Sequence, residues 1–201
     1  MTLPVDPLLS FWFGSTRLDA VVPPAEAGRW FRPDPSFDAE VRERFGALLD
    51  SPDTIASQAV DPASALAAVL VLDQLPRNCF RGTARAFATD APALGVTDRA
   101  MAAGWDDRLG MQQRMFLYLP FQHAEDLARQ DRAVEIYTQL AASAPPELTS
   151  FAGMLPEFAK KHRDIVARFG RFPGRNPALG RPDSPEEAAW LAEGGDTFGQ
   201  R

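Results

Sequence analysis

Cysteine, histidine and long hydrophobic runs are all scarce in this sequence. Of its 201 residues only Cys79 is a cysteine, so no disulfide can form within the chain, as is usual in the reducing cytoplasm. The most apolar stretch, residues 65–72, is far shorter than the roughly 20 residues of a membrane-spanning helix. Residues 1–14 have neither the basic region nor the small-residue cleavage site of a secretory signal. We therefore expect a cytoplasmic protein that does not enter a membrane.

The sequence also lacks an excess of basic side chains. It has 21 lysines and arginines against 27 aspartates and glutamates, which gives a formal net charge of -6. Nucleic acids and anionic membrane surfaces are bound through basic faces, so we expect neither as a partner. His123 and His162 are the only histidines, and any histidine chemistry must therefore use one or both of them.

Helical periodicity dominates the apolar residues, and the alternation typical of β-strands is nearly absent. We expect a helix that begins after Asp61 and ends at Pro76, because proline lacks an amide donor and clashes with the preceding turn. For the same reason a later helix should break at Pro120. Further helices are expected over residues 92–103, 125–142 and 146–169. With 45% hydrophobic residues, the chain is predicted to form a single all-α domain over residues 1–201, a compact array of about seven to nine helices.

The segment VLVLDQLPRNCFRGTARAF, residues 69–87, places a carboxylate on an apolar helix face. Asp73 must be paired or protonated there, because a bare buried carboxylate costs several kcal/mol. Arg77 follows one helical turn later, within reach of an i,i+4 ion pair, and Arg81 and Arg85 continue the spacing of four. One interpretation is a structural ion pair at the helix end. The other is a pocket wall in which Asp73 orients Arg77 toward an anion, since guanidinium groups bind carboxylate and phosphate in a bidentate manner.

Both histidines can likewise be explained in two ways. His162 lies on the apolar stripe of the 146–169 helix, where it is either a hydrogen-bonded core residue or a general acid or base in a dry cleft. His123 precedes Glu125 at a helix start, where acidic residues either complement the helix dipole or form a polar site at the junction. Neither a His-Glu-x-x-His nor a Glu-x-x-His spacing is present, so we expect no metal site.

Four motifs stand in order along nearly the whole chain. They are FWFG at 11–14, LDQLPRNCFRGTARAFATD at 72–90, FLYLPFQHAEDL at 116–127 and HRDIVARFGRFPGRN at 162–176. Together they resemble a bacterial family, domain of unknown function 924 (DUF924). The resemblance implies an all-helical fold related to tetratricopeptide-like superhelices, and it supplies no biochemical activity. The polar signature of the family falls here on Asp73, Gln74, Arg77, Asn78, Arg81, His123, Glu125, His162, Arg163, Asp164, Arg171, Arg175 and Asn176. The family often has a histidine where this chain has Gly174, which argues against a three-histidine metal site.

A signature of Asp, Arg and His side chains on apolar helix faces favours a ligand pocket. The leading hypothesis is a site for a small carboxylate- or phosphate-bearing molecule, with or without acid–base catalysis. In this hypothesis Arg77, Arg81 and Arg171 hold the anion, and a histidine moves a proton. The full candidate set is Asp73, Arg77, Asn78, Arg81, Arg163, Arg171 and Arg175 for binding, and His162, His123 and Glu125 for catalysis.

The alternative is a scaffold that binds a protein or peptide in a concave groove, as tetratricopeptide-like helix arrays do. An exposed apolar stripe would favour it, and the FWFG motif or Trp30 with Phe31 could supply one. A closed shape with a deep polar cavity would count against it. The residues identify no particular ligand, cofactor, reaction class or oligomeric state.

Overall fold

Helices make up the regular structure, and no strand occurs in the part of the chain that the structure describes. The computed structural model describes residues 1–32 and 34–199, and residues 33, 200 and 201 of the expected domain lie outside that description. The predicted all-α class is confirmed, whereas the tetratricopeptide-like superhelix stays a prediction. Within the described ranges, no helix combines the length and the hydropathy needed to cross a membrane.

The elements are short and closely spaced. The α-helices are α1 (Val5–Phe13), α2 (Pro24–Ala27), α3 (Pro35–Phe45), α4 (Pro52–Ser57), α5 (Pro62–Val69), α6 (Leu75–Cys79), α7 (Asp90–Ala102), α8 (Met111–His123), α9 (Leu127–Ala142), α10 (Thr149–Ala152), α11 (Leu155–Phe169), α12 (Asn176–Leu179) and α13 (Pro185–Ala192). A π-helical turn (Leu70–Gln74) joins α5 to α6, and 3-10 turns span Gly28–Trp30, Gly46–Asp50, Ala84–Ala86, Asp106–Arg108, Pro146–Leu148 and Pro173–Arg175.

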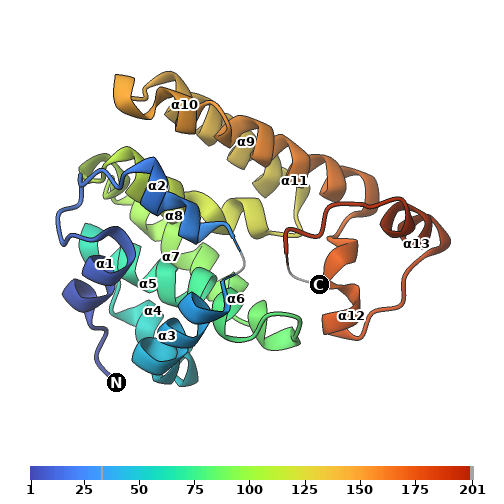
Figure 1. The fold of residues 1–201 in the computed structure, drawn as a ribbon, viewed down its shortest axis with the longest axis horizontal. Coiled ribbons are helices and arrows are strands. Elements are labelled where there is room, and N and C mark those ends of the chain that lie inside the picture. The colour runs from blue at the N-terminus through green and yellow to red at the C-terminus, as the bar shows by residue number, and fades with distance from the viewer. Residues whose placement is uncertain (33, 200–201) are drawn as a thin grey trace.

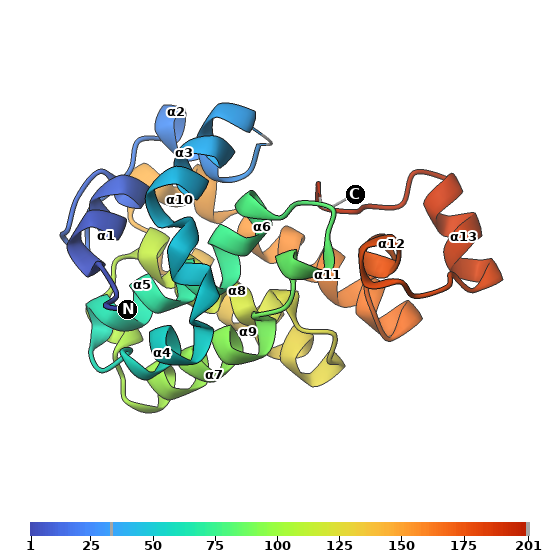
Figure 2. The same cartoon turned by 90° about the horizontal axis from the view of Figure 1, so that it is seen from below.

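Helices that follow one another in the sequence also pack side by side. α5 packs against α7, α7 against α8, α8 against α9, and α9 against α11. Figures 1 and 2 show α9 and α11 as a long pair along one side, with the earlier helices forming the bulk of the molecule. α12 and α13 extend beyond the end of α11, and the chain then returns toward α6. Residues 170–199 therefore form an attachment at one end of the helix array.

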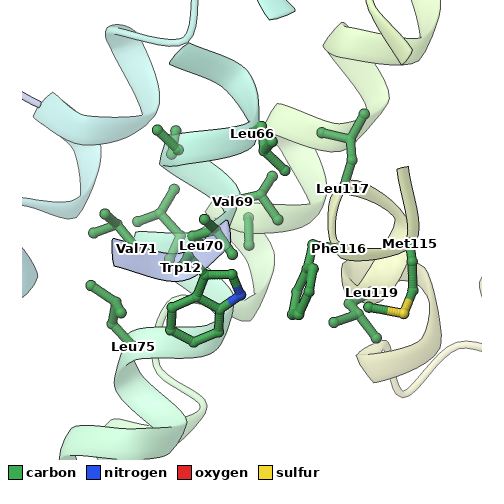
Figure 3. Packing of buried hydrophobic residues seen from close by; sticks show 14 of the residues in the cluster. Trp12, Leu66, Val69, Leu70, Val71, Leu75, Met115, Phe116, Leu117 and Leu119 are labelled. Carbon is green, nitrogen blue, oxygen red and sulfur yellow. The ribbon is translucent and has the colours of Figure 1, made fainter. Parts of the chain in front are cut away.

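Apolar side chains of α1, α5 and α8 form the main core. The ring of Trp12 lies 5.6 Å from that of Phe116 in an edge-to-face arrangement (Figure 3). Leu66 and Leu70 beside them are fully buried, and each such side chain contributes about 1.5–3 kcal/mol by leaving water. A second, much smaller cluster lies in the C-terminal part and joins Ile165, Val166 and Phe172, with Phe169, Trp190 and Phe198 packed against it.

The helix that begins after Asp61 does not end at Pro76, and that prediction is wrong. Its hydrogen bonding shifts register in the π-helical turn, where the amide of Leu75 donates to the carbonyl of Leu70, five residues earlier. Pro76 has no amide for the Leu72 carbonyl, and the Thr89 hydroxyl donates to that carbonyl instead, at 2.5 Å. The helix thus continues through α6, and the turn carries the segment that includes Asp73.

The break expected at Pro120 is also absent, because α8 continues through this proline to His123. An interior proline costs about 3 kcal/mol in an isolated helix. Burial of nearly every side chain of α8 between its neighbours outweighs that cost. The helix expected over 146–169 is instead divided at residues 153–154 into α10 and α11, while those expected over 92–103 and 125–142 match α7 and α9 within two residues.

Candidate functional site

Asp73 is completely buried on the π-helical turn, and it is held by three neighbours. One carboxylate oxygen lies 2.7 Å from His123 Nδ1 and 3.4 Å from Arg77 Nη1, and the other accepts a hydrogen bond from Gln74. Burial by itself would raise the pKa of Asp73, but the charge of Arg77 and the hydrogen bonds from His123 and Gln74 outweigh it and hold this pKa below its usual range. Asp73 is therefore an anion inside the protein.

Arg77 joins Asp73 to a second carboxylate. Its Nη1 donates to the backbone carbonyl of Asp73 at 2.6 Å and lies 2.9 Å from Asp90 Oδ1, and its Nη2 donates to Asp90 Oδ2 at 3.1 Å. The i,i+4 pairing expected from the sequence is thus present, with Asp90 as an additional partner. Asp90 begins α7, where an acidic residue is common for reasons of the helix dipole, so its position alone gave no sign of this role.

Arg175 approaches the same carboxylate from the C-terminal part of the chain. Its Nη1 donates to Asp90 Oδ2 at 3.1 Å, and its Nη2 donates to the carbonyl of His123 at 2.9 Å. The guanidinium also lies over the rings of Phe87 and Phe172, 4.7 and 4.5 Å from their centroids. Burial, together with the charge of Arg77, lowers the pKa of Arg175 to about 10, which still leaves it protonated at neutral pH.

The two histidines are both neutral, with a defined tautomer. An ionised carboxylate and a carbonyl can only accept, so His123 Nδ1 donates to Asp73 at 2.7 Å and His162 Nδ1 donates to the carbonyl of Phe158 at 2.8 Å. Burial and the charge of Arg77 lower the pKa of His123, and burial lowers that of His162 to about 3. Each ring therefore keeps an unprotonated Nε2, and the ring centroids lie 6.2 Å apart.

These groups surround a small cavity of about 70 Å³. By the volume that a water molecule needs, this is room for about five waters. Its polar lining consists of Arg77, Arg175, His123, His162, Asp196 and Thr197, and the rest of its wall is formed by Phe87, Phe172, Gly174 and Phe198. The arrangement offers cationic hydrogen-bond donors and two nitrogen bases to a molecule that enters. It could hold a small anion and accept a proton from it.

Two other predicted site residues hold the C-terminal part in place. Glu125 accepts hydrogen bonds from Arg181 at 2.7 and 2.9 Å and from the amide of Phe172 at 2.8 Å. Arg171 forms a bidentate pair with Glu187 at 2.6 and 2.7 Å. The pairing with Arg171 lowers the pKa of Glu187 to about 2. Neither Glu125 nor Arg171 borders the cavity.

The remaining candidates lie farther from the cavity. Asn78 and Arg81 both donate to Asp38 of α3, at 2.7 and 3.2 Å, and so tie α6 to α3. Arg163 is paired with Asp131 on the surface of α9, at 2.9 Å. Of the sequence candidates, the structure thus brings together Asp73, Arg77, Arg175, His123 and His162 at one place. Among the described residues, no group of three or more His, Cys, Asp or Glu side chains is placed to bind a metal ion.

Comparisons with known proteins agree on one family. The model of a family described as "Bacterial protein of unknown function (DUF924)" matches residues 8–195. A solved structure, that of a protein of unknown function, ATU0120, from Agrobacterium tumefaciens, is 37% identical in sequence, with a TM-score of 0.77. The match covers 94% of this chain and 97% of that one. No protein with a curated description matches this chain.

Proposed function

Because this chain belongs to DUF924, a family of bacterial proteins of unknown function, we propose its function from the cavity itself. The cavity binds a small anionic molecule through Arg175 and Arg77, and His123 accepts a proton from the bound molecule or from a water beside it. Glu125 and Arg171 take no direct part in this proposal. They hold the part of the chain that carries Arg175.

The single observation that carries the proposal is the shared carboxylate of Asp90. Arg175 has Asp90 as its carboxylate partner and shares it with Arg77, which also lies 3.4 Å from Asp73. The pKa of Arg175 falls to about 10 because burial and repulsion from Arg77 exceed what Asp90 restores. Burial therefore makes the charged form of Arg175 less favourable than it is in water. An anion that enters the cavity would favour this charged form through charge-assisted hydrogen bonds.

The proton acceptor follows from the Asp73–His123 pair. A buried carboxylate that accepts a hydrogen bond from Nδ1–H fixes the tautomer and the orientation of an imidazole, as in many hydrolytic enzymes. His123 Nε2 is then a base that is unprotonated at neutral pH. An anion bound next to it would raise the pKa of His123 by favouring the charged ring. Binding would thus strengthen the base where it is needed.

A second candidate function, the peptide-binding scaffold, is favoured by a separate observation. Phe31, Met154 and Phe158 are large apolar side chains that stay about half exposed, and Phe31 lies 6.4 Å from Phe151. Exposed apolar side chains that lie together often mark a protein contact. The scaffold proposal would need this surface, formed by α10, the start of α11 and residue 31, and would not need the cavity.

The test is a thermal-shift and calorimetric screen at fixed ionic strength, with inorganic phosphate and a panel of small carboxylates and organic phosphates. A ligand at a hundred times its dissociation constant should stabilise the wild type by about 2.7 kcal/mol. Arg175→Ala should abolish this shift, and the exposed Arg163→Ala is the matched control that should retain it. Stabilisation that persists in Arg175→Ala, or a panel in which no anion stabilises the wild type, would refute the proposal.

A further inference from the structure

The C-terminal residues Asp196–Gly199, which we call the C-terminal strap, lie against the cavity. The ring of Phe198 stacks on the imidazole of His162, with centroids 3.6 Å apart and planes within 10° of each other. The rings of Phe198 and Phe172 are nearly perpendicular, with their centroids 6.3 Å apart. Asp196, Thr197 and Phe198 all contribute to the cavity wall. The strap thus covers the flat face of one of the two nitrogen bases.

The strap holds this position in a conformation that its sequence does not favour. Phe198 has a φ of 51°, and it is the one residue other than glycine with positive φ among those the structure describes. The left-handed region is unfavourable for a bulky side chain, because its Cβ approaches the following carbonyl oxygen. A residue kept in such a conformation must be held there by its surroundings, here by the stack on His162.

The polar contacts of the strap with the body are weak. The carbonyl of Gly199 accepts a hydrogen bond from Arg81 Nη1 at 3.0 Å, on a partly exposed surface. The amide of Phe198 donates to the side chain of Asp196, which lies within the strap itself. Because a single hydrogen bond between exposed groups contributes little to stability, the strap can leave its place without disrupting the core.

Glycines occur at both ends of the strap region and at the point of the preceding turn that the strap contacts. Gly194, two residues before the strap, and Gly199, its last residue, have φ values of 88° and 68°, which other residues rarely adopt. At Gly174 a Cβ would come within 3.0 Å of Thr197 Cβ. Thr197 therefore lies directly on the backbone of the turn that carries Arg175. The strap thus follows a glycine turn and lies closely on the turn that carries Arg175.

We propose that the C-terminal strap is a lid that opens to admit the ligand, and that Phe198 occupies the place of an aromatic ring of that ligand. The second half rests on the proposed function, because it takes the cavity to be the anion site. The ligand class is then an aromatic carboxylate or phosphate. Its ring lies on the face of His162 that Phe198 covers, and its anionic group reaches Arg175.

Opening of the lid can be tested without any ligand. Diethylpyrocarbonate modifies neutral imidazole nitrogens, and with two histidines in the chain the rate at His162 can be followed by peptide mass spectrometry. The test protein carries Gly174→Cys and Thr197→Cys in a Cys79→Ala background. The Cβ positions at these two sites are 3.0 Å apart, so a shift of less than about 1 Å gives disulfide geometry.

Oxidation of this protein should slow modification of His162 by about tenfold or more, and reduction should restore the rate. The reduced form of the same protein is the control for effects of the substitutions. Phe198→Ala, which needs no engineered bond, should speed the reaction relative to wild type. Equal rates in the oxidised and reduced forms, or no change in Phe198→Ala, would overturn the lid.

Benzoate tests the ligand class, with cyclohexanecarboxylate as a probe of the same charge that lacks a flat face. Phe198→Ala should bind benzoate several-fold more tightly than wild type, and the gain for cyclohexanecarboxylate should be smaller. Equal or weaker benzoate binding in this variant would overturn the aromatic assignment. If Arg175→Ala abolishes benzoate binding while Phe198→Ala changes nothing, the proposed function survives and this inference fails. Redox-dependent labelling of His162 without binding of any anion would support the lid and refute the proposed function.

Discussion

The body of the molecule and its C-terminal part are held together by different forces. The body, α1 to α11, encloses one large apolar core, in which side chains such as Leu66 and Leu70 are fully buried. The part from Gly170 to Gly199 contacts the body through a small apolar cluster, which it shares with Ile165, Val166 and Phe169 of α11, and through charged pairs. These pairs are Arg175 with Asp90 and Arg181 with Glu125, supplemented by the hydrogen bond from Arg81 to Gly199.

The cavity lies at the junction of these two parts. The body supplies Asp73, Arg77 and both histidines, and the C-terminal part supplies Arg175 and the strap. A junction held by polar contacts and a small apolar cluster can open locally at a lower free energy than a core held by extensive apolar burial. The difference between the two parts therefore indicates where the molecule can change shape: at the site, while the helix array stays folded.

The largest loss of stability is expected from a substitution inside the body. Asp73→Ala leaves the Arg77 guanidinium and His123 without their shared partner in a fully buried place. Removal of one member of a buried ion pair costs about 3–5 kcal/mol. Urea denaturation should show this loss in the free energy of unfolding. Asp73→Asn, which keeps the shape but not the charge, is the control and should lose less. A loss below about 1 kcal/mol in Asp73→Ala would mean that the pair does not stabilise the body.

A smaller and local effect is expected at the junction. Glu125→Ala removes the acceptor of Arg181 and of the Phe172 amide. Hydrogen bonds to a charged group contribute about 1.5–3 kcal/mol, so amides of residues 172–180 should exchange on the order of 30-fold faster with deuterium. Amides of α5 and α8 should keep their wild-type protection.

Glu157→Ala, which removes an exposed pair with Lys160, is the matched control for loss of a carboxylate. Uniformly faster exchange throughout the chain in Glu125→Ala would show that the two parts unfold together. In that case the body and the C-terminal part would form one cooperative unit.

Acidification should destabilise the protein, because it contains buried histidines that stay neutral in the folded state. Burial lowers the pKa of His162 to about 3, whereas the unfolded chain titrates near 6.5. Below pH 6.5 the unfolded state therefore binds a proton that the folded state excludes, and stability falls as the pH falls. Between pH 6.5 and pH 5 this contribution is about 2 kcal/mol.

The His162→Gln variant measures that contribution through the difference between its unfolding free energies at the two pH values. The unfolding free energy of His162→Gln should depend less on pH than that of the wild type. The dependence that remains should come from His123, whose pKa is also lowered. The same pH dependence in both proteins would show that folding does not lower the pKa of His162.

The smallest effect is expected on the surface of α11. Arg163 pairs with Asp131 where both side chains are exposed, and such pairs contribute about 0.2–1 kcal/mol. Arg163→Ala should therefore change neither the unfolding free energy beyond that range nor the binding of any anion. Loss of anion binding in this variant would extend the site well beyond the cavity.

The sequence predicts the body better than the junction. Periodic apolar residues located the main helices, and the isolated carboxylate at Asp73 pointed to its pairing with Arg77. The continuation through Pro76 was missed because it depends on the Thr89 hydroxyl, seventeen residues after its acceptor Leu72, and on a π-helical turn that no local pattern indicates. The continuation through Pro120 was missed because tertiary burial of α8 decides it.

The partners of the arginines could not be predicted, because one guanidinium fits many carboxylates equally well. Arg171 and Arg175 are separated by four residues in one motif, yet one binds Glu187 and the other Asp90. Asp90 and the strap gave no signal of their own: one resembles an ordinary helix start, and the other is a short polar segment between glycines. The path of the chain in three dimensions, and not the residue type, decides which arginine lines the cavity and which one only stabilises the surrounding structure.

The protonation state of His123 is the most direct test of the proposed site. Long-range proton–nitrogen NMR spectra resolve the ring nitrogens, and with two histidines the His162→Gln variant assigns both. We predict a neutral His123 ring at pH 7 with its proton on Nδ1, and an Nε2 signal that shifts when a binding anion is added. A proton on Nε2 alone, or a doubly protonated ring at pH 7 without ligand, would contradict the role of His123 as the base.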